Sequence, residues 1–238
     1  MQEPLYLDMW NQALAGVRKH LITYSRHANL TILGERPDGL SKKLFPKMDH
    51  LVCFMPGTVA LGATGGLTVT EAKKSKRWAQ EQDDDMKLAR ELAKTCWGMY
   101  KASATGLAPE ITHFNVSNPP HLETDGRLSS ADISFEDTAN VSWKADYIIK
   151  PQDSHNLQRP ETVETLFYMW RITGETMYRE WGWEMFKSFV QYTTAADGSG
   201  FTSLSNANKI PPTVKDDMES FWLVSKLHDP SLPYSTEP

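Results

Sequence analysis

Apolar residues recur at helical spacing from almost the first residue of the chain. Leu5, Met9, Ala13 and Val17 are each four positions apart, so they share one face of a helix that is predicted over residues 4–24. No cationic and apolar leader precedes this helix. Because the chain begins directly inside a helix, we expect it to be a piece of a longer protein.

The same spacing recurs along the chain, while candidate strands are few. Short β-prone pieces at residues 67–70 and 147–150 predict hairpin strands inside loops. Paired helices with short connections indicate an all-α fold of the α-solenoid or α/α barrel type. The further helices are predicted over residues 84–103, 161–173 and 175–193, with a last one that begins near Val214.

Composition and charge exclude several functions. Of 238 residues, 40% are hydrophobic. The chain has 25 lysines and arginines and 30 acidic residues. With this balance of charges the sequence shows no basic stripe that could bind a phosphate backbone, so we expect no nucleic-acid partner. The longest apolar runs, such as residues 51–55, are far shorter than the roughly 18 to 20 residues of a membrane span, so none is predicted. Residues 73–85 and 118–144 are mostly polar and predict surface insertions.

Aromatic residues and cysteines leave alternatives open. The 25 aromatic rings gather at residues 167–192 and 221–222, where they suit either a packed core or a cavity that binds the apolar faces of sugars. Cys53 and Cys96 can be two buried thiols, or one disulfide in an oxidising lumen. Three glycosylation sequons favour the lumen. These are Asn29-Leu30-Thr31, Asn115-Val116-Ser117 and Asn140-Val141-Ser142.

A candidate catalytic carboxylate lies at the predicted start of a helix. Pro160 suits the first helical position, and Glu161 then faces the free N–H groups and the positive end of the helix dipole. With Arg159 adjacent, this position favours the carboxylate over the acid, so a catalytic Glu161 would be a base. Glu164 shares its helix face. The alternative is an ordinary helix start.

Three other motifs carry candidate chemistry, each with an ordinary explanation. Glu110 follows a Gly and Pro loop, and it can equally be a solvated loop residue. Asp49 and His50 precede an apolar run, where a histidine often has only a structural hydrogen bond. Glu219 belongs to an acidic helix start that is followed by aromatic rings. Singly, none of these motifs specifies a function.

Together and in order, the motifs resemble the class I α-1,2-mannosidases, glycoside hydrolase family 47, from about residue 3 to Leu223. The similarity is greatest to the fungal endoplasmic-reticulum type. It implies part of a barrel of seven helical hairpins, a partial (α/α)7 barrel with short β-hairpin insertions, and inverting removal of α-1,2-linked mannose from N-glycans. The motifs are Asp49-His50-Leu51-Val52-Cys53-Phe54, Gly106-Leu107-Ala108-Pro109-Glu110, Arg159-Pro160-Glu161-Thr162-Val163-Glu164, Tyr178-Arg179-Glu180-Trp181-Gly182-Trp183-Glu184 and Met218-Glu219-Ser220-Phe221-Trp222.

The resemblance implies roles for individual residues. Glu161 matches the carboxylate generally assigned as catalytic base, and Glu110 matches an active-site acid that lines the cavity. Cys53 and Cys96 match the family's disulfide pair, which reverses a slight preference for free thiols. The positions that match those holding mannose, or the water around a bound calcium ion, are His50, Arg159, Glu164 and Glu219.

The chain departs from the family pattern at both ends. The family's general-acid motif and the threonine that binds calcium directly have no counterpart, so no direct metal ligand is assigned here. Thr236-Glu237 echoes the calcium dipeptide but follows Glu219 too closely. We therefore expect residues 1–223 to be the C-terminal part of the catalytic domain and residues 224–238 to be a divergent tail. One explanation is a gene model that reads into an intron.

Three functions from different classes remain open. The resemblance implies a glycosidase that acts on high-mannose N-glycans in the endoplasmic reticulum or Golgi lumen, although activity of this chain alone is uncertain. Any membrane anchor would lie outside this chain. The second is a protein that recognises mannose during glycoprotein degradation without hydrolysing it. The third is a non-catalytic helical scaffold.

The resemblance also predicts how the chain behaves in solution. Each hairpin of a closed barrel packs against two neighbours, so a partial barrel exposes apolar helix faces along its open edges. We expect the isolated chain to self-associate or precipitate, as measured by sedimentation velocity. A monodisperse monomer that melts cooperatively would contradict this expectation.

Overall fold

The structure is a computed structural model that describes residues 4–127 and 143–222. The sequon at Asn140, part of the predicted 118–144 insertion and the predicted tail from residue 224, with Thr236-Glu237, lie outside these residues. The helices are α1 (Pro4–His20), α2 (Met55–Thr64), α3 (Val69–Ala72), α4 (Gln80–Ala102), α5 (Glu161–Thr173) and α6 (Met177–Thr193). The strands are β1 (Ile22–Tyr24), β2 (Thr31–Leu33), β3 (Lys47–Asp49), β4 (Ile111–Phe114) and β5 (Tyr147–Ile148). The short 3-10 helices are η1 (His50–Phe54), η2 (Glu123–Asp125), η3 (Trp143–Asp146) and η4 (Pro151–Asp153).

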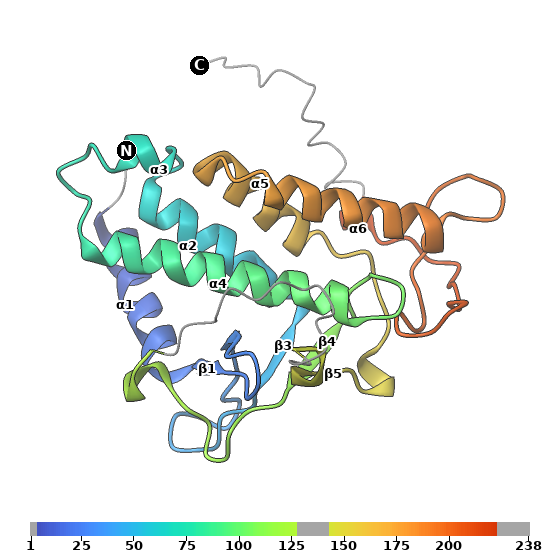
Figure 1. The fold of residues 1–238 in the computed structure, drawn as a ribbon, viewed down its shortest axis with the longest axis horizontal. Helices are drawn as coiled ribbons and strands as arrows, with labels where there is room; N and C mark the ends of the chain where they lie inside the picture. Colours follow the sequence, from blue (N-terminus) through green and yellow to red (C-terminus); the bar gives the residue numbers. More distant parts are fainter. Residues whose placement is uncertain (1–3, 128–142, 223–238) are drawn as a thin grey trace.

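Helix α4 crosses the middle of the structure and organises the core. Helices α2, α5 and α6 lie on one side of it, and the short strands lie on the other (Figure 1). Leu88, Leu92 and Cys96 are spaced by four and fully buried, as the apolar stripe predicts. Trp97 of α4 stacks on Trp181 of α6, with ring centroids 5.5 Å apart. The core is therefore continuous from α4 to the last hairpin, α5 and α6.

The strands form two small antiparallel sheets that connect distant loops. β1 pairs with β2, and β4 lies between β3 and β5. Asp49 at the end of β3 pairs with Ile111 at the start of β4. The pairing continues one residue further, where the His50 N–H donates to the carbonyl of Glu110 at 2.9 Å. This register places two of the predicted site residues side by side.

Most of the predicted elements are confirmed. α5 has the predicted bounds, α4 and α6 differ by a few residues at their starts, and β5 lies within the strand predicted at residues 147–150. Two α-helices, α2 and α3, were not predicted. α2 is apolar on all sides and contains Gly57 and Gly62, so it lacks the one-sided stripe that marks a surface helix. Gly57 lies so close to α5 that an added Cβ would be 3.0 Å from the hydroxyl of Thr165.

Three predictions differ from the structure. The first helix is confirmed over residues 4–20 but ends at His20, because residues 22–24 pair with β2 and form the strand β1. Residues 67–70 are not a strand, since Thr68 and Glu71 form a capping box that starts α3. Val214 does not begin a helix. It lies in an extended segment bridged to Leu204, and the described helical residues resume only at Ser220.

One apolar stretch has the composition of a candidate membrane span. Residues His50–Ala72 reach a mean hydropathy of 1.4 over a sufficient length, with 33% of the window buried. In the structure this stretch is three short helices, interrupted where Gly65 and Gly66 adopt φ values of 65° and 81°. α2 alone has ten residues, about half the length of a span, and packs against α4 and α5. We interpret it as a core helix.

Cys53 of η1 and Cys96 of α4 form a disulfide, with a sulfur–sulfur distance of 2.04 Å. Both residues are fully buried. The bond joins the segment that carries His50 to the central helix across 43 residues of sequence. This confirms the pairing that the family resemblance implies, and not the free-thiol alternative.

Removing the disulfide should destabilise the chain strongly. Loop-closure entropy for a separation of 43 residues corresponds to about 4 kcal/mol of unfolding free energy. A Cys53→Ala and Cys96→Ala double variant, compared with the oxidised wild type in urea unfolding, should show a loss of this size. The reduced wild type is the matched control and should unfold at a similar urea concentration. A loss below about 1 kcal/mol would contradict the expectation.

Candidate active site

Four of the six predicted site residues form one connected polar cluster. The carboxylate of Glu110 accepts from Arg159 Nε, with distances of 2.6 and 2.8 Å to its two oxygens. Arg159 Nη1 lies 4.0 Å from Glu161 Oε1. Glu161 Oε2 in turn contacts His50 Nδ1. Carboxylates from a loop and a helix start are thus joined through one guanidinium group.

Backbone contacts position the loop that carries Glu110. Its N–H donates to the carbonyl of His155 at 2.8 Å and to that of Asp153 at 3.1 Å. The amide of Asn156 donates to the carbonyl of Ala108 at 2.8 Å, and its oxygen accepts from the N–H of Gln158 at 3.0 Å. Because Asn156 binds both segments, the loop before Glu110 is held against the segment that leads to Arg159.

The segment before α5 is held in an unusual backbone conformation. Gln158 is fully buried and has a φ of 60°, a left-handed value that few residues other than glycine adopt. Its hydrogen bond to Asn156 fixes this turn. The turn is followed by Arg159 and by Pro160, which precedes the first residue of α5. The chain therefore changes direction immediately before the two residues that meet in the cluster.

Charges around Arg159 keep it protonated. Partial burial lowers the pKa of its guanidinium, but the hydrogen bond to Glu110 and the charges of Glu110, Glu161 and Glu219 outweigh burial and raise it. The guanidinium also lies 5.4 Å from the ring centroid of Phe221. Arg159 thus brings the predicted residue Glu219 into the electrostatic environment of the cluster.

Glu161 is a buried carboxylate at the start of α5. It is only 3% exposed, and no side chain caps the helix start. The positive end of the helix dipole, Arg159 and the ring of His50 all favour a negative charge at this position. The local environment therefore agrees with the interpretation of Glu161 as a base.

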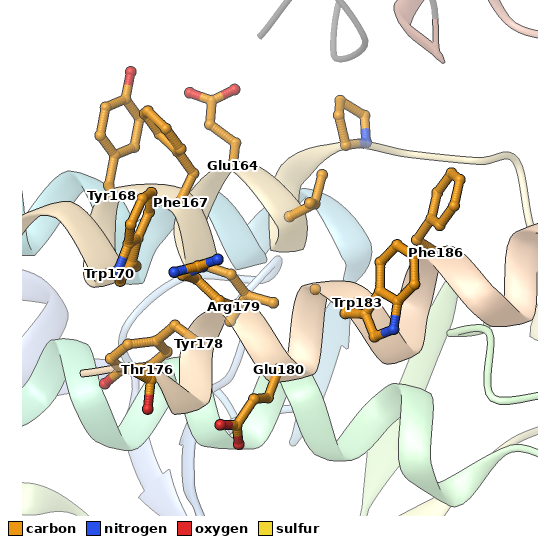
Figure 2. A pocket seen from close by; sticks show the side chains of 14 residues that line it. Glu164, Phe167, Tyr168, Trp170, Thr176, Tyr178, Arg179, Glu180, Trp183 and Phe186 are labelled. Atoms are coloured by element: carbon orange, nitrogen blue, oxygen red, sulfur yellow. The ribbon is translucent and has the colours of Figure 1, made fainter. Parts of the chain in front are cut away.

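Glu164 is the predicted site residue that the structure places apart. It has no hydrogen bond or ion pair with the other five within residues 4–127 and 143–222. It lines a groove of about 1020 Å³ between α5 and α6 (Figure 2). Glu164 lies beside Phe167 and Tyr168 of α5, while Trp183 and Phe186 project from α6. Residues of α5 that follow Glu161 thus form part of one wall of the groove.

The aromatic residues of the chain therefore serve two purposes. Trp97 and Tyr100 pack in the core, as the first alternative predicts. Trp183 is 60% exposed and stacks on Phe186 in the open groove. The guanidinium of Arg179 lies over the ring of Trp170, with 5.0 Å between the guanidinium carbon and the ring centroid. Trp183, Phe186 and Val190 of α6 thus form an exposed apolar stripe in this chain.

Sequence reasoning missed Tyr100 as a site residue. Its hydroxyl lies 2.8 Å from His50 Nε2, on the side of the ring opposite Glu161. Thr162 Oγ1 lies 3.4 Å from the same nitrogen. Tyr100 is part of the apolar stripe of α4, one turn after Cys96, so periodicity marks it only as a core residue. The predicted disulfide between Cys53 and Cys96 was the available signal, because it brings this turn of α4 to η1.

The described residues do not by themselves fit a calcium site. No group of three or more histidine, cysteine, aspartate or glutamate side chains within them is arranged to hold a metal ion. The oxygens of Glu110 are both engaged by Arg159. The residue that echoes the family's calcium ligand, Thr236, lies outside the described residues. We therefore derive no chemical step through a metal.

Comparison with protein families shows to which family this chain belongs. The model of glycosyl hydrolase family 47 matches residues 1–228. The chain belongs to glycosyl hydrolase family 47. The predicted resemblance is thereby confirmed, and the cluster around Arg159 lies within the matched region.

Relatives in family 47 carry mannosidase names. The chain is 46% identical over 234 residues to a mannosyl-oligosaccharide 1,2-alpha-mannosidase of Candida albicans, which covers 95% of the chain and 37% of the relative. It is 40% identical over 231 residues to the endoplasmic reticulum mannosyl-oligosaccharide 1,2-alpha-mannosidase of Saccharomyces cerevisiae, covering 94% and 39%. The chain thus spans less than two fifths of the length of these relatives.

A solved family structure confirms the fold class. The alpha-1,2-mannosidase from Trichoderma reesei superposes with a TM-score of 0.68 at 22% identity, over 93% of this chain and 40% of that one. At this identity the match concerns the fold alone. The helices of this chain therefore correspond to part of an α/α barrel.

The ion pair between Arg159 and Glu110 should be a strong structural link. In a double-mutant cycle of Arg159→Gln and Glu110→Gln, we expect a coupling of about 1.5 to 3 kcal/mol in urea unfolding, because a charged hydrogen bond is shielded from water. The side chains are 21% and 14% exposed. As a matched control, Lys101→Met and Glu184→Gln remove a pair that is 37% and 45% exposed, and should couple by less than about 1 kcal/mol. Equal coupling in the two cycles would contradict this prediction.

Proposed function

We propose that this protein hydrolyses terminal α-1,2-linked mannose from high-mannose N-glycans with inversion, through a site to which this chain contributes Glu161. The observation that supports this most directly is the buried carboxylate of Glu161, held between His50 and Arg159 at the start of α5. The mannosidase names of the family 47 relatives agree with it. Activity belongs to the whole protein, of which this chain is a part.

Glu161 acts as the general base in this proposal. An inverting glycosidase needs a carboxylate that takes a proton from water as the water attacks the sugar carbon. The contacts of Glu161 with His50 and Arg159 hold its carboxylate in one place within the site. The proton for the departing oxygen comes from a second carboxylic acid on the opposite face of the sugar.

Glu110 is better suited to a charged role than to proton donation. Both of its oxygens accept from Arg159 Nε, so both are engaged as acceptors and neither is directed at a departing sugar oxygen. We therefore assign Glu110 to the wall of the cavity, where it orients Arg159 and contributes negative charge near the developing cation. The general acid would then come from a part of the protein outside this chain.

The remaining candidate residues are proposed to bind the sugar. Arg159 and Glu219 offer donors and acceptors for hydroxyl groups, and the neighbouring ring of Phe221 offers an apolar face. His50 orients Glu161, and Glu164 extends the polar surface along α5. The calcium ion that the family generally uses would need ligands beyond the described residues. It would supply positive charge for sugar hydroxyl groups and water.

The proposed location is the lumen of the endoplasmic reticulum. The relative from Saccharomyces cerevisiae is named as an endoplasmic reticulum enzyme. The buried disulfide between Cys53 and Cys96 is a bond that oxidising compartments maintain. The sequons at Asn29 and Asn115 fit the same compartment.

The direct test is mannose release from a Man9 N-glycan, with added calcium, by the whole protein that contains this chain. The Glu161→Gln variant should lower the rate roughly 100- to 10,000-fold, the usual contribution of a general base, while glycan binding persists. Nuclear magnetic resonance of the first product should show the β anomer, as inversion requires.

The matched control for this test is Glu184→Gln. Glu184 lies on α6, is paired with Lys101 and is 45% exposed, so its variant should retain the wild-type rate. A Glu161→Gln rate within a few-fold of wild type would refute the assignment of the base. Glycan binding with no release by the wild type would instead support a mannose-recognition protein.

A further inference from the structure

A buried relay of three side chains ends on the candidate base. His50 is 2% exposed, Glu161 is 3% exposed and Tyr100 is fully buried. The ring of His50 lies between the other two: Nδ1 contacts Glu161 Oε2, and Nε2 lies 2.8 Å from the hydroxyl of Tyr100. With both ring nitrogens engaged, the ring has one hydrogen-bonded orientation.

The direction of each hydrogen bond follows from the groups involved. A carboxylate can only accept, so the contact with Glu161 requires a proton on Nδ1 of His50. In a neutral imidazole Nε2 is then an acceptor. The hydroxyl of Tyr100 lies 2.8 Å from it and that of Thr162 lies 3.4 Å from it, so the closer hydroxyl, that of Tyr100, is the donor. Burial raises the pKa of Tyr100 well above its ordinary value, so this hydroxyl keeps its proton.

The surrounding packing holds the tyrosine in place. Its ring meets that of His50 edge to face, with centroids 5.7 Å apart, and stacks on Trp97 at 6.1 Å. Tyr100 lies one turn after Cys96 on α4, and His50 lies three residues before Cys53. The disulfide therefore crosses between the two elements beside the hydrogen bond.

We propose that Tyr100 is a positioning residue for the base: its hydroxyl donates to Nε2 of His50 and thereby keeps the Nδ1–H of His50 directed at the carboxylate of Glu161. This inference rests on the proposed function for its catalytic consequence. The hydrogen-bond geometry that carries it does not depend on turnover.

The first test reads the histidine directly. In the ¹⁵N-labelled whole protein that contains this chain, the ring nitrogens of His50, assigned by comparison with His50→Gln, should show a protonated Nδ1 and an unprotonated, hydrogen-bonded Nε2. Tyr100→Phe removes only the hydroxyl and should move the Nε2 shift toward that of an unbonded nitrogen. Tyr147→Phe is the matched control, because Tyr147 is also buried and donates to the carbonyl of Thr95 at 3.1 Å, away from His50. Its His50 shifts should stay at the wild-type values.

The second test is kinetic and uses mannose release by the same proteins. Tyr100→Phe should lower kcat about tenfold, equivalent to about 1.4 kcal/mol or one hydrogen bond, with KM changed less than about twofold. Tyr147→Phe should match the wild type in both constants. This split separates positioning of the base from a general loss of structure.

Two results would overturn the proposal. One is a set of His50 shifts that is the same in Tyr100→Phe and wild type. The other is a wild-type His50 with both nitrogens protonated, since Tyr100 would then accept. A whole wild-type protein that releases no mannose would count against the proposed function alone, because the nitrogen shifts still decide the role of Tyr100.

Discussion

A carboxylate that leaves water must find charged or polar partners inside the protein, and the described part of this chain is arranged around that requirement at Glu161. Transfer of an ionised group to the interior without partners is prohibitively unfavourable. The start of α5, the ring of His50 and the guanidinium of Arg159 supply those partners. Arg159 precedes α5 by two residues, whereas His50 comes from η1, so the pairing of β3 with β4 and the hydrogen bonds of Asn156 are needed to bring these partners together.

Local sequence chemistry predicts the helices and loops that carry the site residues better than it predicts which of these residues contact one another. The start of α5 at Glu161 follows from Pro160 and the apolar spacing after it. The contact between Glu110 and Arg159 does not, because it depends on the sheet register and on the left-handed turn at Gln158. Likewise, Tyr100 has the spacing of a core residue, and only its position opposite His50 gives it a polar partner.

The errors in the predicted fold have three physical origins. Periodicity detects helices with one buried face, so α2, which is apolar all round, escapes it. Short segments such as residues 22–24 and the stretch around Val214 take their conformation from pairing with distant strands and loops. At Thr68 a side chain of the right length caps a helix, which outweighs the β propensity of its neighbours.

The position of the disulfide links the oxidation state of the surroundings to the geometry of the site. Until Cys53 and Cys96 are joined, η1 and α4 are held together by non-covalent contacts alone, and these two elements carry His50 and Tyr100. A reduced chain has the same side chains with a less constrained geometry. Oxidation of one buried bond therefore constrains both partners of this contact at once, so a change in redox conditions reaches the site without altering any of its polar groups.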